Sequence, residues 1–83
     1  PNPFNPTTKL RYDLPEDAFV NITIYDLMGR NVRSLVNSEL SAGSHWVIWD
    51  ARNGNGEIVP AGMYIYMIRA GDFVRSRKMV LLK

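Results

Sequence analysis

The loop at residues 50–57 is the segment whose residue types could do chemistry. Its sequence, Asp-Ala-Arg-Asn-Gly-Asn-Gly-Glu, places carboxylate and amide oxygens between glycines, and such oxygens are the ligands that calcium prefers. The weak candidates for ligands are Asp50, Asn53 and Asn55. The spacing does not match the calcium-binding helix-loop-helix motif, because no glutamate occupies the twelfth position counted from Asp50 or from Asn53. Asn-Gly pairs are also ordinary turn sequences, so we predict no metal site.

The inventory of residues argues against catalysis. His45 is the only histidine, and the chain has no cysteine. A Ser-His-acid arrangement would have to use His45, which falls inside an expected strand. The adjacent Glu16 and Asp17 lie in an expected turn beside Pro15, where solvent leaves both carboxylates ionised. We therefore predict that the chain is not an enzyme and has no cofactor.

Aromatic side chains offer another kind of binding chemistry, because exposed rings could stack on sugars. Trp46 is the main candidate for such a platform, and three tyrosines could join it: Tyr25, Tyr64 and Tyr66. Tyr64 and Tyr66 share a strand parity, and we expect them to line the core with Trp49, since large aromatic side chains dominate small cores. An exposed Trp46 beside tyrosines would favour a carbohydrate-binding module, and a buried Trp46 would argue against it.

Alternation of apolar and polar residues dominates the chain and predicts strands with one buried face. The expected strands cover residues 10–14, 20–24, 32–36, 44–50, 63–70 and 73–82. Turn-forming residues mark the connections, with a polar loop at 37–43, the longest loop at 51–62, and hairpin turns at 26–30 and 71–72. This spacing predicts an all-β fold, an immunoglobulin-like antiparallel β-sandwich of about seven short strands.

The length of 83 residues predicts one small domain, able to bury about 60–65% of the surface that its unfolded chain exposes. That is enough for one two-layer core but not for a deep catalytic cleft. Apolar runs such as residues 79–82 are far too short to span a bilayer, so we predict no transmembrane segment.

The net charge is only +2, and we predict no nucleic-acid partner. The cations are nevertheless concentrated in the last fifteen residues, where Asp72 is the only acid. These cations are Arg69, Arg75, Arg77, Lys78 and Lys83. They form either a solvated strand face that discourages edge pairing or a surface for an anionic partner. Their alternation with apolar residues favours the solvated face.

The chain opens with Pro1, Asn2 and Pro3, and another proline follows at position 6. Prolines donate no backbone hydrogen bond and bias the preceding residue toward an extended conformation. We therefore expect residues 1–7 to form a stiff linker and opening motif, and residues 8–83 to form the sandwich. Such a beginning also indicates a piece of a longer polypeptide.

Seven short motifs occur along the chain in a set order: Pro-Asn-Pro-Phe-Asn-Pro-Thr-Thr at 1–8, Leu-Pro at 14–15, Ile-Tyr-Asp-Leu-Met-Gly-Arg at 24–30, Ala-Gly-Ser-His at 42–45, Trp-Asp at 49–50, Val-Pro-Ala-Gly-Met-Tyr at 59–64 and Lys-Met-Val-Leu-Leu-Lys at 78–83. Together they resemble the type A C-terminal sorting domains of type IX secretion cargo. Those domains belong to a broader group similar to the immunoglobulin-like domain of the flagellar hook-capping protein FlgD. Each motif alone is weak, but their order and spacing make the set fairly specific.

This resemblance implies a secretion signal. In such cargo the sandwich follows an N-terminal passenger and is read by the type IX translocon of the outer membrane. In many members a sortase then removes the domain and attaches the passenger to the surface of a Gram-negative cell. The implied route is through the periplasm to the cell surface or the medium. The motifs place translocon recognition at Pro1, Asn2, Pro3, Gly29, Arg30, Lys78, Met79, Val80, Leu81, Leu82 and Lys83.

Several of these residues also have a purely structural interpretation. Residues 79–82 either offer an unpaired strand to the translocon or complete the core. Arg30 either reaches a partner from a hairpin tip or pairs with Asp26. Deleting the last five residues is expected to abolish export and leave most of the fold intact. The Trp-Asp-Gly common in these domains has Ala51 in its third position here, a change that bears on a turn.

Two other functional classes stay open. One is a structural FlgD-like module within an extracellular assembly, and the other is a carbohydrate-binding accessory domain. A dimer formed through an exposed strand is a further possibility, because unpaired strand edges template pairing with a second chain.

Overall fold

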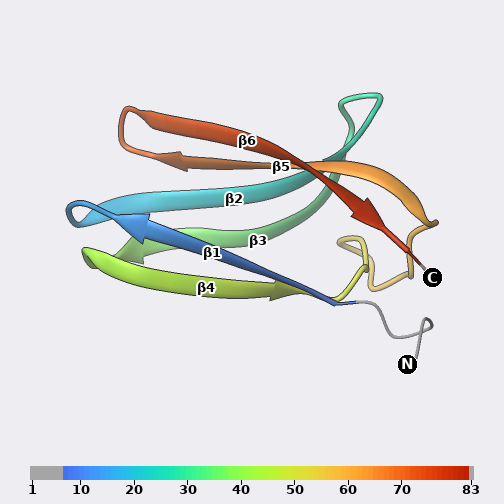
Figure 1. Ribbon diagram of the computed structural model, residues 1–83, viewed down its shortest axis with the longest axis horizontal. Helices are drawn as coiled ribbons and strands as arrows, with labels where there is room; N and C mark the ends of the chain where they lie inside the picture. Colours follow the sequence, from blue (N-terminus) through green and yellow to red (C-terminus); the bar gives the residue numbers. More distant parts are fainter. Residues whose placement is uncertain (1–6, 83) are drawn as a thin grey trace.

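The computed structural model describes residues 7–82, which form two antiparallel sheets (Figure 1). The strands are β1 (Thr8–Leu14), β2 (Ala18–Asp26), β3 (Asn31–Leu40), β4 (Gly43–Trp49), β5 (Gly62–Ala70) and β6 (Phe73–Leu81). β1 pairs with β4 in the small sheet, and the large sheet has the order β3-β2-β5-β6. The all-β immunoglobulin-like sandwich is confirmed, with six strands where about seven were expected. No helix in the described part of the chain is long and apolar enough to cross a membrane.

The core lies between the two sheets and is built from alternate residues of each strand, which point to the same face. Three side chains of β2 are fully buried: Val20, Ile22 and Ile24. Tyr64 and Tyr66 of β5 are buried beside them, and Trp49 of β4 enters from the small sheet. The Trp49 and Tyr64 rings meet edge to face with centroids 5.2 Å apart. The expectation that these three aromatic side chains line the core is therefore confirmed.

Both predicted hairpin turns are present. Residues 26–30 connect β2 to β3, and Gly71 and Asp72 connect β5 to β6. Gly29 and Gly71 have φ angles of 83° and 60°, in the left-handed region that favours glycine because it has no Cβ. Glycine at these two positions therefore fits the tight connections between paired strands.

β3 is longer than the sequence pattern indicates. Residues 37–40 were expected to begin a polar loop, but they continue the ladder with β2, where Asn37 lies opposite Asn21. Asn21 Nδ2 also donates a hydrogen bond to Asn37 Oδ1 at 3.2 Å. The expected loop is wrong at these four positions. Residues 37–39 are exposed on an edge strand, and they belong to the strand through backbone pairing with β2. Because no side chain among them is buried, the sequence shows no apolar alternation there.

The two sheets are unequal in width. Between β4 and β5 there is only an isolated bridge that joins Arg52 to Ile58, so residues 7–82 contain no seventh strand. Arg75 and Arg77 of β6 lie opposite the buried Ile68 and Tyr66, yet both arginines are exposed. The small sheet therefore leaves part of the inward face of β6 uncovered.

Candidate interaction surfaces

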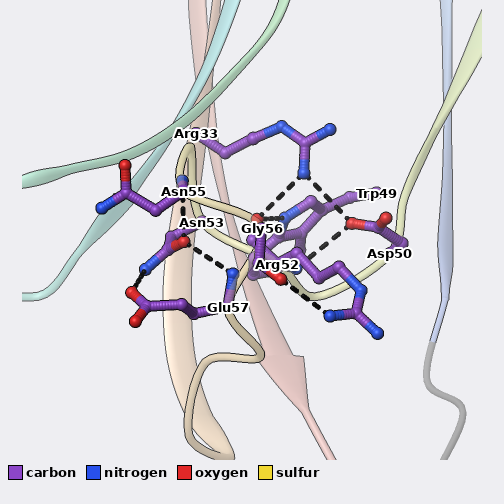
Figure 2. Close-up of polar contacts among 8 residues, drawn as sticks. All are labelled: Arg33, Trp49, Asp50, Arg52, Asn53, Asn55, Gly56 and Glu57. Carbon is purple, nitrogen blue, oxygen red and sulfur yellow. Dashed lines mark hydrogen bonds and ion pairs between the residues drawn. The ribbon is translucent and has the colours of Figure 1, made fainter.

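The loop between β4 and β5 uses its polar groups to hold itself together (Figure 2). Asn53 Oδ1 accepts hydrogen bonds from the backbone N–H groups of Asn55 and Glu57, at 2.9 and 3.0 Å. Asp50 Oδ1 accepts hydrogen bonds from Arg33 Nη1 and from the Arg52 N–H, both at 3.2 Å. Among residues 7–82, no three His, Cys, Asp or Glu side chains gather as metal ligands would. The weak calcium candidates Asp50 and Asn53 thus direct their oxygens into the loop.

Two side chains anchor this loop to the sandwich. Trp49 Nε1 and Arg33 Nη1 both donate to the carbonyl oxygen of Arg52, at 3.0 and 3.2 Å (Figure 2). Ala51, which replaces the usual glycine of the Trp-Asp-Gly motif, is buried and has a φ of 63°. A residue with a Cβ is disfavoured in that conformation. The turn therefore keeps the geometry that glycine favours, although the residue is alanine.

The β2–β3 turn is organised by one carboxylate. Asp26 Oδ1 accepts hydrogen bonds from the backbone N–H groups of Met28 and Arg30, both at 2.9 Å. Arg30 Nε donates to Asp26 Oδ2 at 2.8 Å, so the internal pairing considered for Arg30 is present. The Arg30 side chain is nevertheless 77% exposed. Its guanidinium group is therefore accessible while its Nε holds the turn, and a recognition role for Gly29 and Arg30 stays a proposal.

The Asp26 carboxylate predicts a loss of stability in acid. The hydrogen bond from the backbone N–H of Arg30 lowers the pKa of Asp26. Desolvation of the carboxylate raises this pKa, whereas the Arg30 side chain and the Met28 N–H lower it further. Since the folded-state pKa is depressed, this contribution to the free energy of unfolding is present above the unfolded value of about 4. It is lost as the pH falls through the folded value.

Urea unfolding at pH 7 and near pH 2 tests this prediction in Asp26→Asn and the unaltered chain. The variant is expected to be less stable at pH 7 and to lose less stability on acidification. Asp72, in the other hairpin turn, provides the control substitution Asp72→Asn. An equal loss on acidification in Asp26→Asn and the unaltered chain would contradict the role of this carboxylate.

The outer face of the small sheet carries an exposed tryptophan. Trp46 is 57% exposed, and Lys9 Nζ lies 4.5 Å from the centroid of its ring. The residue opposite Trp46 on β1 is Arg11. No tyrosine of the described chain shares this face, because Tyr12 points inward and stacks on His45 and the other tyrosines belong to the large sheet. The exposure of Trp46 favours a binding surface, but not the aromatic platform expected of a sugar-binding module.

β6 combines an open edge with one deeply buried residue. Within the part of the chain that the structure describes, it pairs only with β5, and its outward side chains include Lys78 and Val80, which are exposed. Met79 packs against the core, and Leu81 is only 5% exposed. Leu82 follows the strand and is exposed. Both interpretations of residues 79–82 thus have a structural counterpart, since Leu81 completes the core and Val80 with Leu82 remains accessible.

His45 has a local structural environment. Its Nε2 lies 2.7 Å from the carbonyl oxygen of Ser41, and its ring stacks on Tyr12 with centroids 5.5 Å apart. No serine hydroxyl and carboxylate flank it among the contacts of residues 7–82. The remaining candidates for recognition, Pro1, Asn2, Pro3 and Lys83, lie outside the described residues.

Two packed antiparallel sheets with a core of alternating side chains define an immunoglobulin-like β-sandwich. The model of the FlgD Ig-like domain family matches residues 4–72, and the chain belongs to that family. It is 40% identical over 67 residues to the basal-body rod modification proteins FlgD of Salmonella typhimurium and Salmonella typhi. The match covers 80% of this chain but only 29% of each relative.

Solved structures share the fold. FlgD from P. aeruginosa has a TM-score of 0.73 at 25% identity, over 93% of this chain and 62% of that one. FlgD from Xanthomonas campestris, described in connection with hook capping in flagellar assembly, has a TM-score of 0.69 at 28% identity, over 92% of this chain and 54% of that one. Latent PorU from Porphyromonas gingivalis also has a TM-score of 0.69, over 99% of this chain and 9% of that one. Its 22% identity shows a shared fold alone.

Four cations gather in a place that the sequence did not indicate. Lys9 and Arg11 of β1 lie near Arg75 and Arg77 of β6, around one groove. The sequence shows a concentration of cations in the segment that includes β6. It does not show that the cations of β1 lie close to them, because those are more than sixty positions away in the chain. Parity could have placed Arg75 and Arg77 there, because they share the inward parity of Met79 and Leu81, whereas Lys9 and Arg11 have the outward parity of β1.

Proposed function

We propose that the chain is a non-catalytic, structural immunoglobulin-like module that joins a larger polypeptide to an assembly outside the cytoplasm, at the cell surface. Its membership of the FlgD Ig-like domain family carries this proposal, together with 40% identity to rod modification proteins. The relatives are more than three times as long as the matched segment, which supports a role as one part of a larger chain.

The chemistry of the surface supports contact with a partner. The polar groups of the 50–57 loop and of the 26–30 turn are used in local hydrogen bonds. Large apolar side chains are exposed on both sheets, among them Trp46, Ile48, Met63 and Val80. Exposed apolar side chains that form a patch mark interaction sites in soluble proteins. The module therefore offers surfaces for binding and no matched acid and base.

Replacing the module tests this function. In the gene product that contains this chain, residues 7–82 are exchanged for an unrelated immunoglobulin-like domain of similar size, which preserves length and folding. The unaltered polypeptide is expected to sediment with a surface assembly larger than itself, and the exchanged polypeptide is expected to sediment alone. Fractionation of cells followed by sedimentation provides the measurement.

A sorting signal for type IX secretion is the second candidate. The ordered motifs of the chain and the open edge of β6 support it, because an unpaired strand can be captured by strand addition. Its partners would be the type IX translocon, a sortase and an N-terminal passenger. Gly29, Arg30 and the exposed side chains of Lys78, Val80 and Leu82 would contribute to recognition.

A fusion separates the two candidates. A signal peptide and a fluorescent passenger are placed ahead of the full chain and expressed in a bacterium with type IX secretion. A sorting signal sends the passenger to the cell surface or the medium. A module that only joins an assembly leaves the folded passenger in the periplasm while other cargo is exported.

A further inference from the structure

A groove runs along the side of the sandwich where the small sheet ends, between β1 and β6. We call it the seam groove, and it has a volume of about 310 Å³. Arg75 and Arg77 of β6 face it, and its apolar lining includes Tyr66 and Phe73. Lys9 and Arg11 border it on the β1 side, with their side chains on the outer face of the small sheet. In Figure 1 β1 is drawn between β4 and β2, with the β5–β6 hairpin beyond β2, and within residues 7–82 only β4 is paired with β1.

The charge of the seam groove is unbalanced. Asp13 is the only acid that lines it, and its carboxylate accepts a hydrogen bond from the Ser44 hydroxyl at 2.6 Å. None of the four cations forms an ion pair with a residue in the range 7–82. Arg75 instead lies over the Phe73 ring, 5.3 Å from its centroid. Arg75 and Arg77 therefore face the groove without carboxylate partners in the described chain, and Lys9 and Arg11 add positive charge at its β1 border.

Backbone pairing is also incomplete here. Among residues 7–82, β1 pairs only with β4, so its other edge has no strand partner in this part of the chain. A third strand added to the small sheet beside β1 would lie over the inward face of β6. Arg75 and Arg77 stand on that face, at positions that would be apolar if the core were closed there. Those arginines are two residues apart, which is about 6.6 Å along the strand. Alternate side chains of any added strand have the same spacing.

We propose that the seam groove binds an extended acidic segment of a partner polypeptide, which adds to β1 as a third strand. Carboxylates at alternate positions of that segment pair with Arg75 and Arg77, and its backbone completes the edge of β1. The side chains between them point to the opposite, outer face of the small sheet. A polyanion without a peptide backbone would use the charges alone. This inference rests on the proposed function, because it names the chemistry of a partner in the assembly.

Titration of the isotopically labelled 83-residue chain with a short peptide tests the proposal. The peptide is capped at both ends, is about as long as β1 and alternates glutamate with valine. Amide resonances of β1 and of residues 73–77 are expected to shift. A peptide with glutamine in place of glutamate should bind about tenfold more weakly, because it cannot form charge-assisted pairs. The same glutamate peptide with alternate backbone N-methyl groups should also lose binding, because it cannot pair as a strand.

Two double variants with equal loss of charge locate the site. Arg75→Gln with Arg77→Gln removes the groove cations and is expected to weaken binding about tenfold. Arg69→Gln with Lys78→Gln removes cations from outward positions of the β5–β6 hairpin and should change binding by less than about twofold. Both pairs are exposed, so both variants should fold.

Three results would overturn the inference: no binding at low salt, equal weakening by the two double variants, or undiminished binding of the N-methylated peptide. The last result would reveal a general anion site. Each of them leaves the module-exchange result unaffected, because an assembly could be contacted through another face. Failure of the exchange experiment together with binding of the peptide would instead refute the proposed function alone.

Discussion

Replacing Trp49 by alanine is expected to lower the free energy of unfolding by about 3–5 kcal/mol. Trp49 is 1% exposed and packs edge to face on Tyr64. Its indole N–H also donates to the Arg52 carbonyl, so the substitution removes an anchor of the 50–57 loop as well as core volume. A domain of this size has a total stability of about 4–12 kcal/mol, so a large share of it is lost.

The chain supplies a matched control in Trp46→Ala. Trp46 lies on the same strand, three residues earlier, but is 57% exposed. We expect that substitution to cost less than about 1 kcal/mol. Urea unfolding followed by circular dichroism measures both variants. Equal losses at the two positions would show that the sides of β4 are assigned wrongly.

Removing residues 79–83 is expected to destabilise the sandwich by at least about 2–5 kcal/mol, the usual loss for one buried leucine. Leu81 belongs to the core, and Met79 packs against it. Met79 and Val80 also pair with Tyr64 and Met63 of β5. The sequence-based expectation was that this deletion leaves most of the fold intact, and the structure favours a different result, because the deletion removes a core side chain and the end of a ladder.

Point substitutions separate the structural and the exposed parts of that segment. Leu81→Ala should lower the free energy of unfolding by about 2–5 kcal/mol. Val80→Ala, at an exposed position, should lower it by less than about 1 kcal/mol. Thermal unfolding of both variants and of the truncated chain provides the comparison. A truncated chain as stable as the full one would contradict the placement of Leu81. Export studies should accordingly use Val80 and Leu82 variants in place of the truncation.

Local patterns in the sequence predicted most of the fold. Alternation identified Trp49 and the core tyrosines, because burial of one strand face leaves a period-two signature, but it left the exposure of Trp46 open. The Asp26–Arg30 pair was also foreseeable, since the two residues are four positions apart in one hairpin turn. The second half of β3 left no such signature, because its residues are mostly exposed.

Contacts between distant segments could not be predicted from the sequence. Arg33 and Asp50 are 17 positions apart and meet only because the chain crosses from one sheet to the other. The sequence pattern favours a solvated face for Arg75 and Arg77, whereas the strand register places them on the inward side of β6. They are exposed there because the small sheet has only two strands, a property of strand order that alternation does not encode.

The central claim is that this chain contributes contact surfaces, and no reaction, to a larger polypeptide in an assembly outside the cytoplasm. Its most direct test is the exchange of residues 7–82 for an unrelated immunoglobulin-like domain. The measurement is the fraction of the surface-exposed polypeptide that sediments with other proteins. Our account predicts that this fraction falls to background while the rest of the polypeptide stays folded and keeps any activity of its own. An unchanged fraction would contradict it.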